Sequence, residues 1–223
     1  MCGRFTLGAE STTLTETFPG FEMPEGQTAR YNIAPTQDVA VIPNTGEKKI
    51  ELFHWGLIPS WAKDPKIGNR MINARSETLA EKPSFRAAYK RRRCLILADG
   101  YYEWKKEPDN RLKIPIYIRM ASGKPFALAG LWEQWYPSKD DAPLHSCTII
   151  TCPPNPLLSE IHHRMPVILP PSAYSQWLAP QEQPPDNLNA LLTPYPDEEM
   201  EAYAVSRFVN RPKNDSPECI TPI

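Results

Sequence analysis

The chain has 223 residues, with 25 lysines and arginines against 26 aspartates and glutamates, a formal net charge of -1. Hydrophobic residues make up 41% and charged residues 23%, and this balance excludes an intrinsically disordered protein. No apolar run approaches the roughly 18 residues of a membrane span, and the residues after Met1 lack the apolar core of a signal peptide. We therefore expect a cytoplasmic protein without a membrane partner, folded as a single domain over residues 1–223.

The 26 prolines divide the sequence into short elements. Short, turn-bounded apolar runs rich in β-branched or aromatic residues predict strands. Short segments, several of them opened by Ser, Asn or Asp as an N-cap, predict helices. In chain order we expect a helix over 11–18, a strand over 39–42, a helix over 84–90, strands over 94–98, 115–118, 126–132 and 147–151, and helices over 155–161, 172–178 and 186–192. With few strand-helix-strand repeats, this order predicts an α+β fold, a single compact domain around a mixed, mostly antiparallel, barrel-like sheet with short helices.

The charges are unevenly distributed along the chain. Residues 59–119 hold 15 lysines and arginines against 7 acids, whereas residues 172–201 hold six acids and no base. This pattern is compatible with a basic face for nucleic acid, and equally with a basic middle balanced by acids elsewhere in the fold. The basic run 90–93 is open to the same two interpretations, a solvated surface or a phosphate contact.

The cysteines argue against a disulfide framework and against a metal site. There are five, an odd number, at positions 2, 94, 147, 152 and 219, and no two form a CxxC pair. The adjacent pair His162 and His163 is a poor metal site, because neighbouring side chains diverge on a helix or strand. We expect no metal and no cofactor.

Cys2 is the most informative residue for function. Removal of Met1 would expose a 1,2-aminothiol, whose α-amine has a pKa of about 7.7 to 8.0 and is partly neutral near pH 7. Such an amine attacks aldehydes, and the neighbouring thiol can close the resulting imine to a five-membered thiazolidine. An incidental cysteine at a frayed terminus is the alternative that position alone leaves open.

Five polar segments with glycine or proline turns are distributed over the whole chain: MCGRF at 1–5, RYNIAP at 30–35, NARSET at 73–78, DGYYEW at 99–104 and IHHRMP at 161–166. Together, in this order, they resemble the SRAP family, the SOS response-associated peptidase-like proteins that include abasic-site processing proteins. The resemblance implies a compact α+β domain around a barrel-like sheet, with Cys2 at the floor of a DNA-binding cleft.

The same resemblance implies roles for four residues. Cys2 would be the nucleophile, Asn73 an orienting amide, Glu103 an acid-base carboxylate and His162 an acid-base imidazole. Imine formation requires removal of a proton from the amine and delivery of one to the leaving hydroxyl, and Glu103 and His162 could divide that work. His163 is the competing imidazole; His162 occupies the histidine position of the IHxRxP pattern.

The resemblance also implies contacts to DNA. Arg4, Arg75 and Arg164 would hold the phosphates that flank a missing base, with structural pairing to acids such as Glu77 as the alternative. Trp61 would stack on a neighbouring unpaired base, or else be a buried core residue. Thr151 aligns with a position in the family's pocket.

Three classes of function follow from these residues. The first is covalent capture of abasic sites in single-stranded DNA during the DNA damage (SOS) response, with lyase cleavage by β-elimination as a variant of the same imine. The second is a peptidase or amidohydrolase, including self-cleavage, in which Cys2 is the nucleophile. The third is a non-catalytic single-strand binder, for which Cys2 is dispensable. We expect a monomer that associates with the nucleoid when bound to DNA; the sequence identifies no protein partner.

Overall fold

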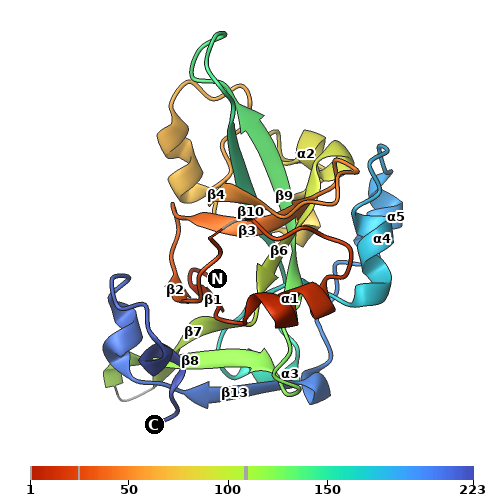
Figure 1. Ribbon diagram of the computed structural model, residues 1–223. Helices are drawn as coiled ribbons and strands as arrows, with labels where there is room; N and C mark the ends of the chain where they lie inside the picture. The colour runs from red at the N-terminus through yellow and green to blue at the C-terminus, as the bar shows by residue number, and fades with distance from the viewer. Residues whose placement is uncertain (1, 25, 108–109) are drawn as a thin grey trace.

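The computed structural model describes residues 2–24, 26–107 and 110–223, and its strands form two sheets. In Figure 1 the strands β7, β8 and β13 of the five-stranded sheet lie below the strands of the larger, eight-stranded sheet. The strands are β1 (Phe5–Leu7), β2 (Arg30–Ile33), β3 (Asp38–Pro43), β4 (Glu51–Trp55), β5 (Asn73–Arg75), β6 (Arg93–Ala98), β7 (Gly100–Glu107), β8 (Asn110–Met120), β9 (Phe126–Trp135), β10 (Leu144–Cys152), β11 (Met165–Pro166), β12 (Ile168–Leu169) and β13 (Met200–Ala204).

Five strands of the larger sheet close on themselves. The path runs β10-β4-β3-β6-β9, and β9 pairs again with β10, from Trp135 opposite Leu144 to Gly130 opposite Ile149. Only the β10–β4 contact of this ring is parallel, so the barrel is mixed and mostly antiparallel. The predicted fold class is therefore confirmed as a single domain around a barrel with a further sheet and short helices.

The second sheet, in the order β13-β8-β7-β1-β2, is antiparallel throughout. In it, β1 carries the N-terminal motif and lies between β2 of the RYNIAP motif and β7 of the DGYYEW motif. Gly100 permits this packing, because a Cβ there would lie 2.1 Å from the Tyr117 hydroxyl. Three of the five sequence motifs thus meet in adjacent strands.

The predicted strands are confirmed within β3, β6, β8, β9 and β10, and the predicted helices are confirmed with shifted ends. The helices are α1 (Ser11–Thr17), α2 (Arg86–Arg91), α3 (Pro156–Ser159), α4 (Tyr174–Trp177) and α5 (Pro185–Asn189). In Figure 1, α4 and α5 lie on one side of the barrel. Among the described residues no helix is long and apolar enough to cross a membrane.

The segment between β4 and β5 leaves the barrel and returns to it beside the site. Gly56, at a φ of 141°, and Gly68 approach closely, and a Cβ on Gly56 would lie 2.7 Å from the Gly68 carbonyl oxygen. Leu57 N–H donates to the Met71 carbonyl at 3.2 Å. This close contact holds the 3₁₀ helix Pro65–Arg70 in place, and soon after it the chain enters β5, which begins at Asn73.

Candidate functional site

Cys2 is completely buried, although it is the second residue of the chain. Asn73 Nδ2 donates to the Cys2 carbonyl oxygen at 2.8 Å, so β5 holds the backbone of the candidate nucleophile directly. The Asn73 side-chain oxygen is buried and has no hydrogen-bond partner among the described residues. This amide therefore orients Cys2 through one atom and offers an acceptor with the other.

Glu103 lies beside Cys2, and only 4% of it is exposed. Burial raises the pKa of Glu103 from its ordinary 4.5 to about 7, with the Lys113 ammonium acting in the opposite direction. Burial first and the Glu103 charge second raise the pKa of the Cys2 thiol far above its ordinary value. Near neutral pH the site thus contains a carboxyl that readily exchanges a proton and a thiol that remains protonated.

His162 sits in the turn before β11, and its ring can take either protonation state. Its Nδ1 atom lies 3.1 Å from both the backbone nitrogen and the carbonyl oxygen of Arg164. The neutral ring accepts from the N–H, and the protonated ring donates to the carbonyl. Burial chiefly lowers the pKa of His162, helped by His163 and Lys113. The His163 ring lies tilted against that of His162, with 4.3 Å between ring centroids, but His163 is itself exposed.

Thr151 and Arg164 lie together at the end of β10. Thr151 is fully buried and stands opposite Arg75 across the parallel β10–β5 pair. Arg164 Nη2 donates to the Thr151 carbonyl, and its guanidinium forms a two-pronged ion pair with Glu77 at 2.5 and 3.0 Å. Arg164 thus has the acid partner that the structural interpretation named, whereas the Arg75 side chain is exposed.

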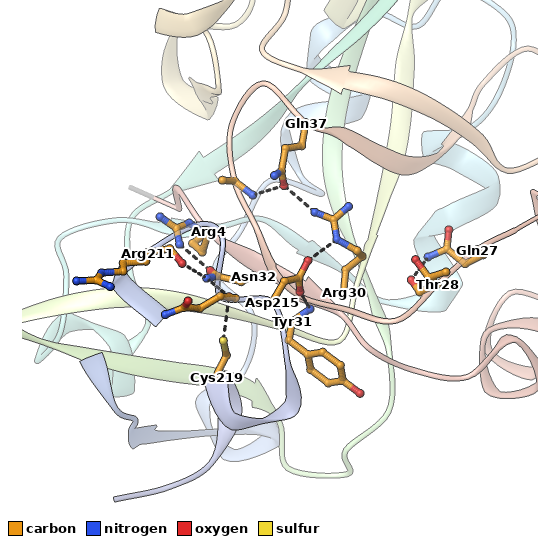
Figure 2. Close-up of polar contacts among 12 residues, drawn as sticks. Arg4, Gln27, Thr28, Arg30, Tyr31, Asn32, Gln37, Arg211, Asp215 and Cys219 are labelled. Atoms are coloured by element: carbon orange, nitrogen blue, oxygen red, sulfur yellow. Dashed lines mark hydrogen bonds and ion pairs between the residues drawn. The ribbon is translucent and has the colours of Figure 1, made fainter. Parts of the chain in front are cut away.

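The Arg4 guanidinium points into the protein. Its Nη1 donates to Asn32 Oδ1 at 2.6 Å (Figure 2). It also donates to the Val209 carbonyl at 2.9 Å, and the guanidinium lies 5.7 Å from the Trp104 ring centroid. These contacts tie the N-terminal strand to the C-terminal segment. The phosphate role of Arg4 stays a prediction, and Arg4 has a structural role in addition.

Trp61 is a surface residue, 59% exposed, so its interpretation as a core residue is wrong. It borders a hollow of about 460 Å³ that is also lined by three cations, Lys63, Lys66 and Arg70, and by one acid, Asp64. We did not single out these cations from the sequence, although they belong to the basic stretch 59–119. An exposed indole among cations is suited to stacking on unpaired bases.

The basic run 90–93 is a basic surface only in part: Lys90 and Arg91 are exposed, whereas both interpretations are wrong for Arg93. Arg93 is fully buried and donates to five backbone carbonyls, those of Tyr89, Lys90, Trp177, Ala179 and Gln181. Arg91 pairs with Glu182 and Arg92 with Glu133. The run ends a helix and enters a barrel strand, so its side chains diverge into the core and toward acidic partners.

Sequence reasoning gave no role to Lys113 or to Asn32. Lys113, exposed on β8, acts electrostatically on both Glu103 and His162. Asn32 is fully buried inside the RYNIAP motif. All five cysteines are free and buried. In the described ranges, no three His, Cys, Asp or Glu side chains gather as metal ligands.

Comparison with known proteins gives relatives over the full length. The model of the SOS response associated peptidase (SRAP) family matches residues 1–212. The chain is 50% identical over 223 residues to the abasic site processing protein YoqW of Bacillus subtilis, with 99% of each chain covered. It is 35% identical over 201 residues to abasic site processing protein HMCES of Gallus gallus, covering 81% of this chain and 59% of that protein.

Solved structures agree with this relationship. A protein from Bacteroides thetaiotaomicron superposes with a TM-score of 0.89 at 28% identity, and 100% of both chains is covered. A protein from Bordetella bronchiseptica superposes with a TM-score of 0.78 at 26% identity, covering 92% of this chain and 100% of that one. Since the family model spans nearly the whole sequence, this chain belongs to the SRAP family.

Proposed function

We propose that this protein processes abasic sites in single-stranded DNA by covalent attachment through Cys2 after removal of Met1. The observation that carries the proposal is the buried grouping of Cys2 with Asn73 and with a carboxyl of raised pKa, Glu103. The relatives' name, abasic site processing protein, supports the choice of lesion. The family description supports a role in the SOS response to DNA damage.

The first step is attack of the neutral Cys2 amine on the aldehyde of the ring-opened abasic sugar. The new N–C bond forms as the carbonyl π bond breaks, and loss of water then leaves an imine. Glu103 takes the proton released by the amine, and His162 protonates the sugar oxygen during ring opening and the hydroxyl that leaves. The buried Asn73 oxygen accepts a hydrogen bond from the amine and fixes its direction.

The second step is closure by the thiol. Because the Cys2 thiol stays protonated at neutral pH, the amine reacts first and the sulfur second. The S–H adds across the C=N bond: sulfur bonds to the sugar carbon, and the thiol proton reaches the imine nitrogen by way of Glu103. The product is a thiazolidine that protects the lesion from strand cleavage, and no oxidant or cofactor is needed.

The DNA strand is held by charge and stacking. Arg75, Arg164 and Arg4 contact the flanking phosphates, Thr151 lines the sugar pocket, and Trp61 stacks on the base beside the gap. The Glu77 carboxylate has to release Arg164, in part or wholly, for a phosphate to bind there.

The experiment is to incubate the purified protein with a single-stranded oligonucleotide that carries one abasic site, and to look for a heat-stable adduct on a denaturing gel. Intact mass first verifies that Met1 has been removed. The adduct should form with the wild type, disappear in Cys2→Ala, and form slowly in Glu103→Gln. A free N-terminal cysteine that gives no adduct would overturn covalent capture.

Two other activities are distinguished in the same assay. Lyase activity by β-elimination from the imine would appear as a cleaved strand, and Cys2→Ser, which keeps the amine but lacks the thiol, should shift the products toward it. A peptidase, the activity in the family's description, requires Cys2 but no DNA. Cleavage of a peptide substrate by wild type without adduct formation would favour that activity.

A further inference from the structure

The C-terminal segment 206–214 presents charge that the proposed mechanism does not use. It holds three basic residues, Arg207, Arg211 and Lys213, and no acid. All three side chains are exposed, and within the described residues they form no hydrogen bond or ion pair. Phe208, between them in sequence, is 38% exposed. The next acid, Asp215, is already neutralised by Arg30 at 2.6 Å.

Buried polar groups hold this segment in one conformation. Asn32 Nδ2 lies within hydrogen-bond distance of three of its carbonyls, those of Val209 at 3.1 Å, Arg211 at 3.0 Å and Asn214 at 2.6 Å. Asn214 Nδ2 donates back to the Phe208 carbonyl at 2.7 Å, and the Cys219 thiol donates to the Asn214 carbonyl. In Figure 2 the Arg211 side chain points away from this cluster while its backbone faces Asn32.

The segment adjoins the candidate active site. Arg4, two residues after Cys2, donates to the Val209 carbonyl at 2.9 Å. Trp104, the residue after Glu103, donates through its indole N–H to Asn210 Oδ1 at 2.8 Å. Each of the two central site residues therefore has a near neighbour in the chain bound to the 3₁₀ helix Arg207–Asn210. A strand attached at Cys2 would have this segment within reach of its backbone.

We infer that segment 206–214 is a second phosphate-contacting surface, on which Arg207, Arg211 and Lys213 bind the backbone of the single strand that flanks the abasic site. A loop that is already rigid and whose cations face solvent loses little conformational entropy when it binds. Each guanidinium can donate two parallel hydrogen bonds to two oxygens of one phosphate. The exposed Phe208 ring offers an additional face for a base. The inference rests on the proposed function, since it places this surface on the same DNA.

The test is non-covalent binding as a function of salt. The probe is a fluorescent single-stranded oligonucleotide with a tetrahydrofuran residue, an abasic analogue without an aldehyde, so that no adduct forms. Each phosphate contact on a single strand contributes about 0.7 to the slope of log K against log salt, so the triple variant Arg207→Ala, Arg211→Ala, Lys213→Ala should lower the slope by about 2. The double variant Arg207→Lys, Arg211→Lys, which keeps both charges, should keep most of the wild-type slope.

The matched control removes the same charge elsewhere, by Lys48→Ala, Lys49→Ala and Lys124→Ala, three exposed lysines in the connections after β3 and β8. The control variant should bind with the wild-type slope, and thermal midpoints should be equal in all variants. A triple variant that keeps the wild-type slope, or loses no more than the control, would overturn the inference. Failure of the proposed function would give a different result. The wild type would then form no adduct with a true abasic site, whatever salt slopes the variants show with the analogue.

Discussion

At the scale of single residues, the protonation of Glu103 connects chemistry to stability. Its pKa of about 7 means that the carboxylate base is lost as the pH falls below neutrality. The single-turnover rate of cross-linking should therefore fall below about pH 7 in the wild type. In Glu103→Gln the rate should be lower at all pH values. The decrease near pH 7 that belongs to Glu103 should be absent, so that only titration of the amine changes the rate with pH. An unchanged inflection in the variant would assign the pH dependence to another group.

The same raised pKa has a stability consequence. The folded state holds the Glu103 proton more tightly than the unfolded chain does, so the stabilisation is complete below pH 4.5 and is lost as the pH rises to about 7. Glu103→Gln should accordingly increase the free energy of unfolding by up to about 3 kcal/mol at alkaline pH and change it little in acid. Urea denaturation at both pH values measures this difference; equal effects at both would refute the linkage.

At the scale of elements, Arg164 and Glu77 connect the turn before β11 to the 3₁₀ helix Ser76–Thr78 after β5. If Arg164 also binds phosphate, Glu77→Gln should raise affinity for single-stranded DNA, because the arginine loses its competing anion. Arg164→Ala should lower affinity and reduce the salt slope by about 0.7. Fluorescence anisotropy with the abasic analogue measures both. If Glu77→Gln destabilises the fold and leaves affinity unchanged, the pair is structural alone.

Three strands of the five-stranded sheet, β1, β2 and β7, show why local signals were incomplete. β1 has three residues and β2 has four, too few for an apolar or alternating pattern to be distinguished. β7 reads GYYEWKKE, in which the buried half carries Glu103 and the outer half is charged. Their strand conformation comes from pairing with each other, Phe5 with Ile33 on one side and Tyr101 on the other.

At the scale of the whole molecule, Arg93 fastens the helical side to the barrel. Its guanidinium donates to carbonyls from α2, from the end of α4 and from the connection that follows α4. Arg93→Met should lower the free energy of unfolding by about 3 kcal/mol, because several buried carbonyls lose their donor. Urea denaturation measures it, with Lys90→Met as the exposed neighbouring control. A loss no larger than that of the control would show that water replaces the guanidinium.

The sequence by itself identified the family and was the origin of the proposed covalent chemistry, through a cysteine at position 2 and five motifs in order. It also predicted five strands, of which four belong to the barrel and one, β8, to the five-stranded sheet. Only the tertiary structure decided which side chains are buried and which groups the charged ones contact. Arg93 in a basic run is buried, Arg4 is bound to a carbonyl 205 residues away, and Trp61 is exposed. The physical reason is that local patterns set backbone preference and reactivity, whereas desolvation and pairing depend on contacts between distant parts of the chain.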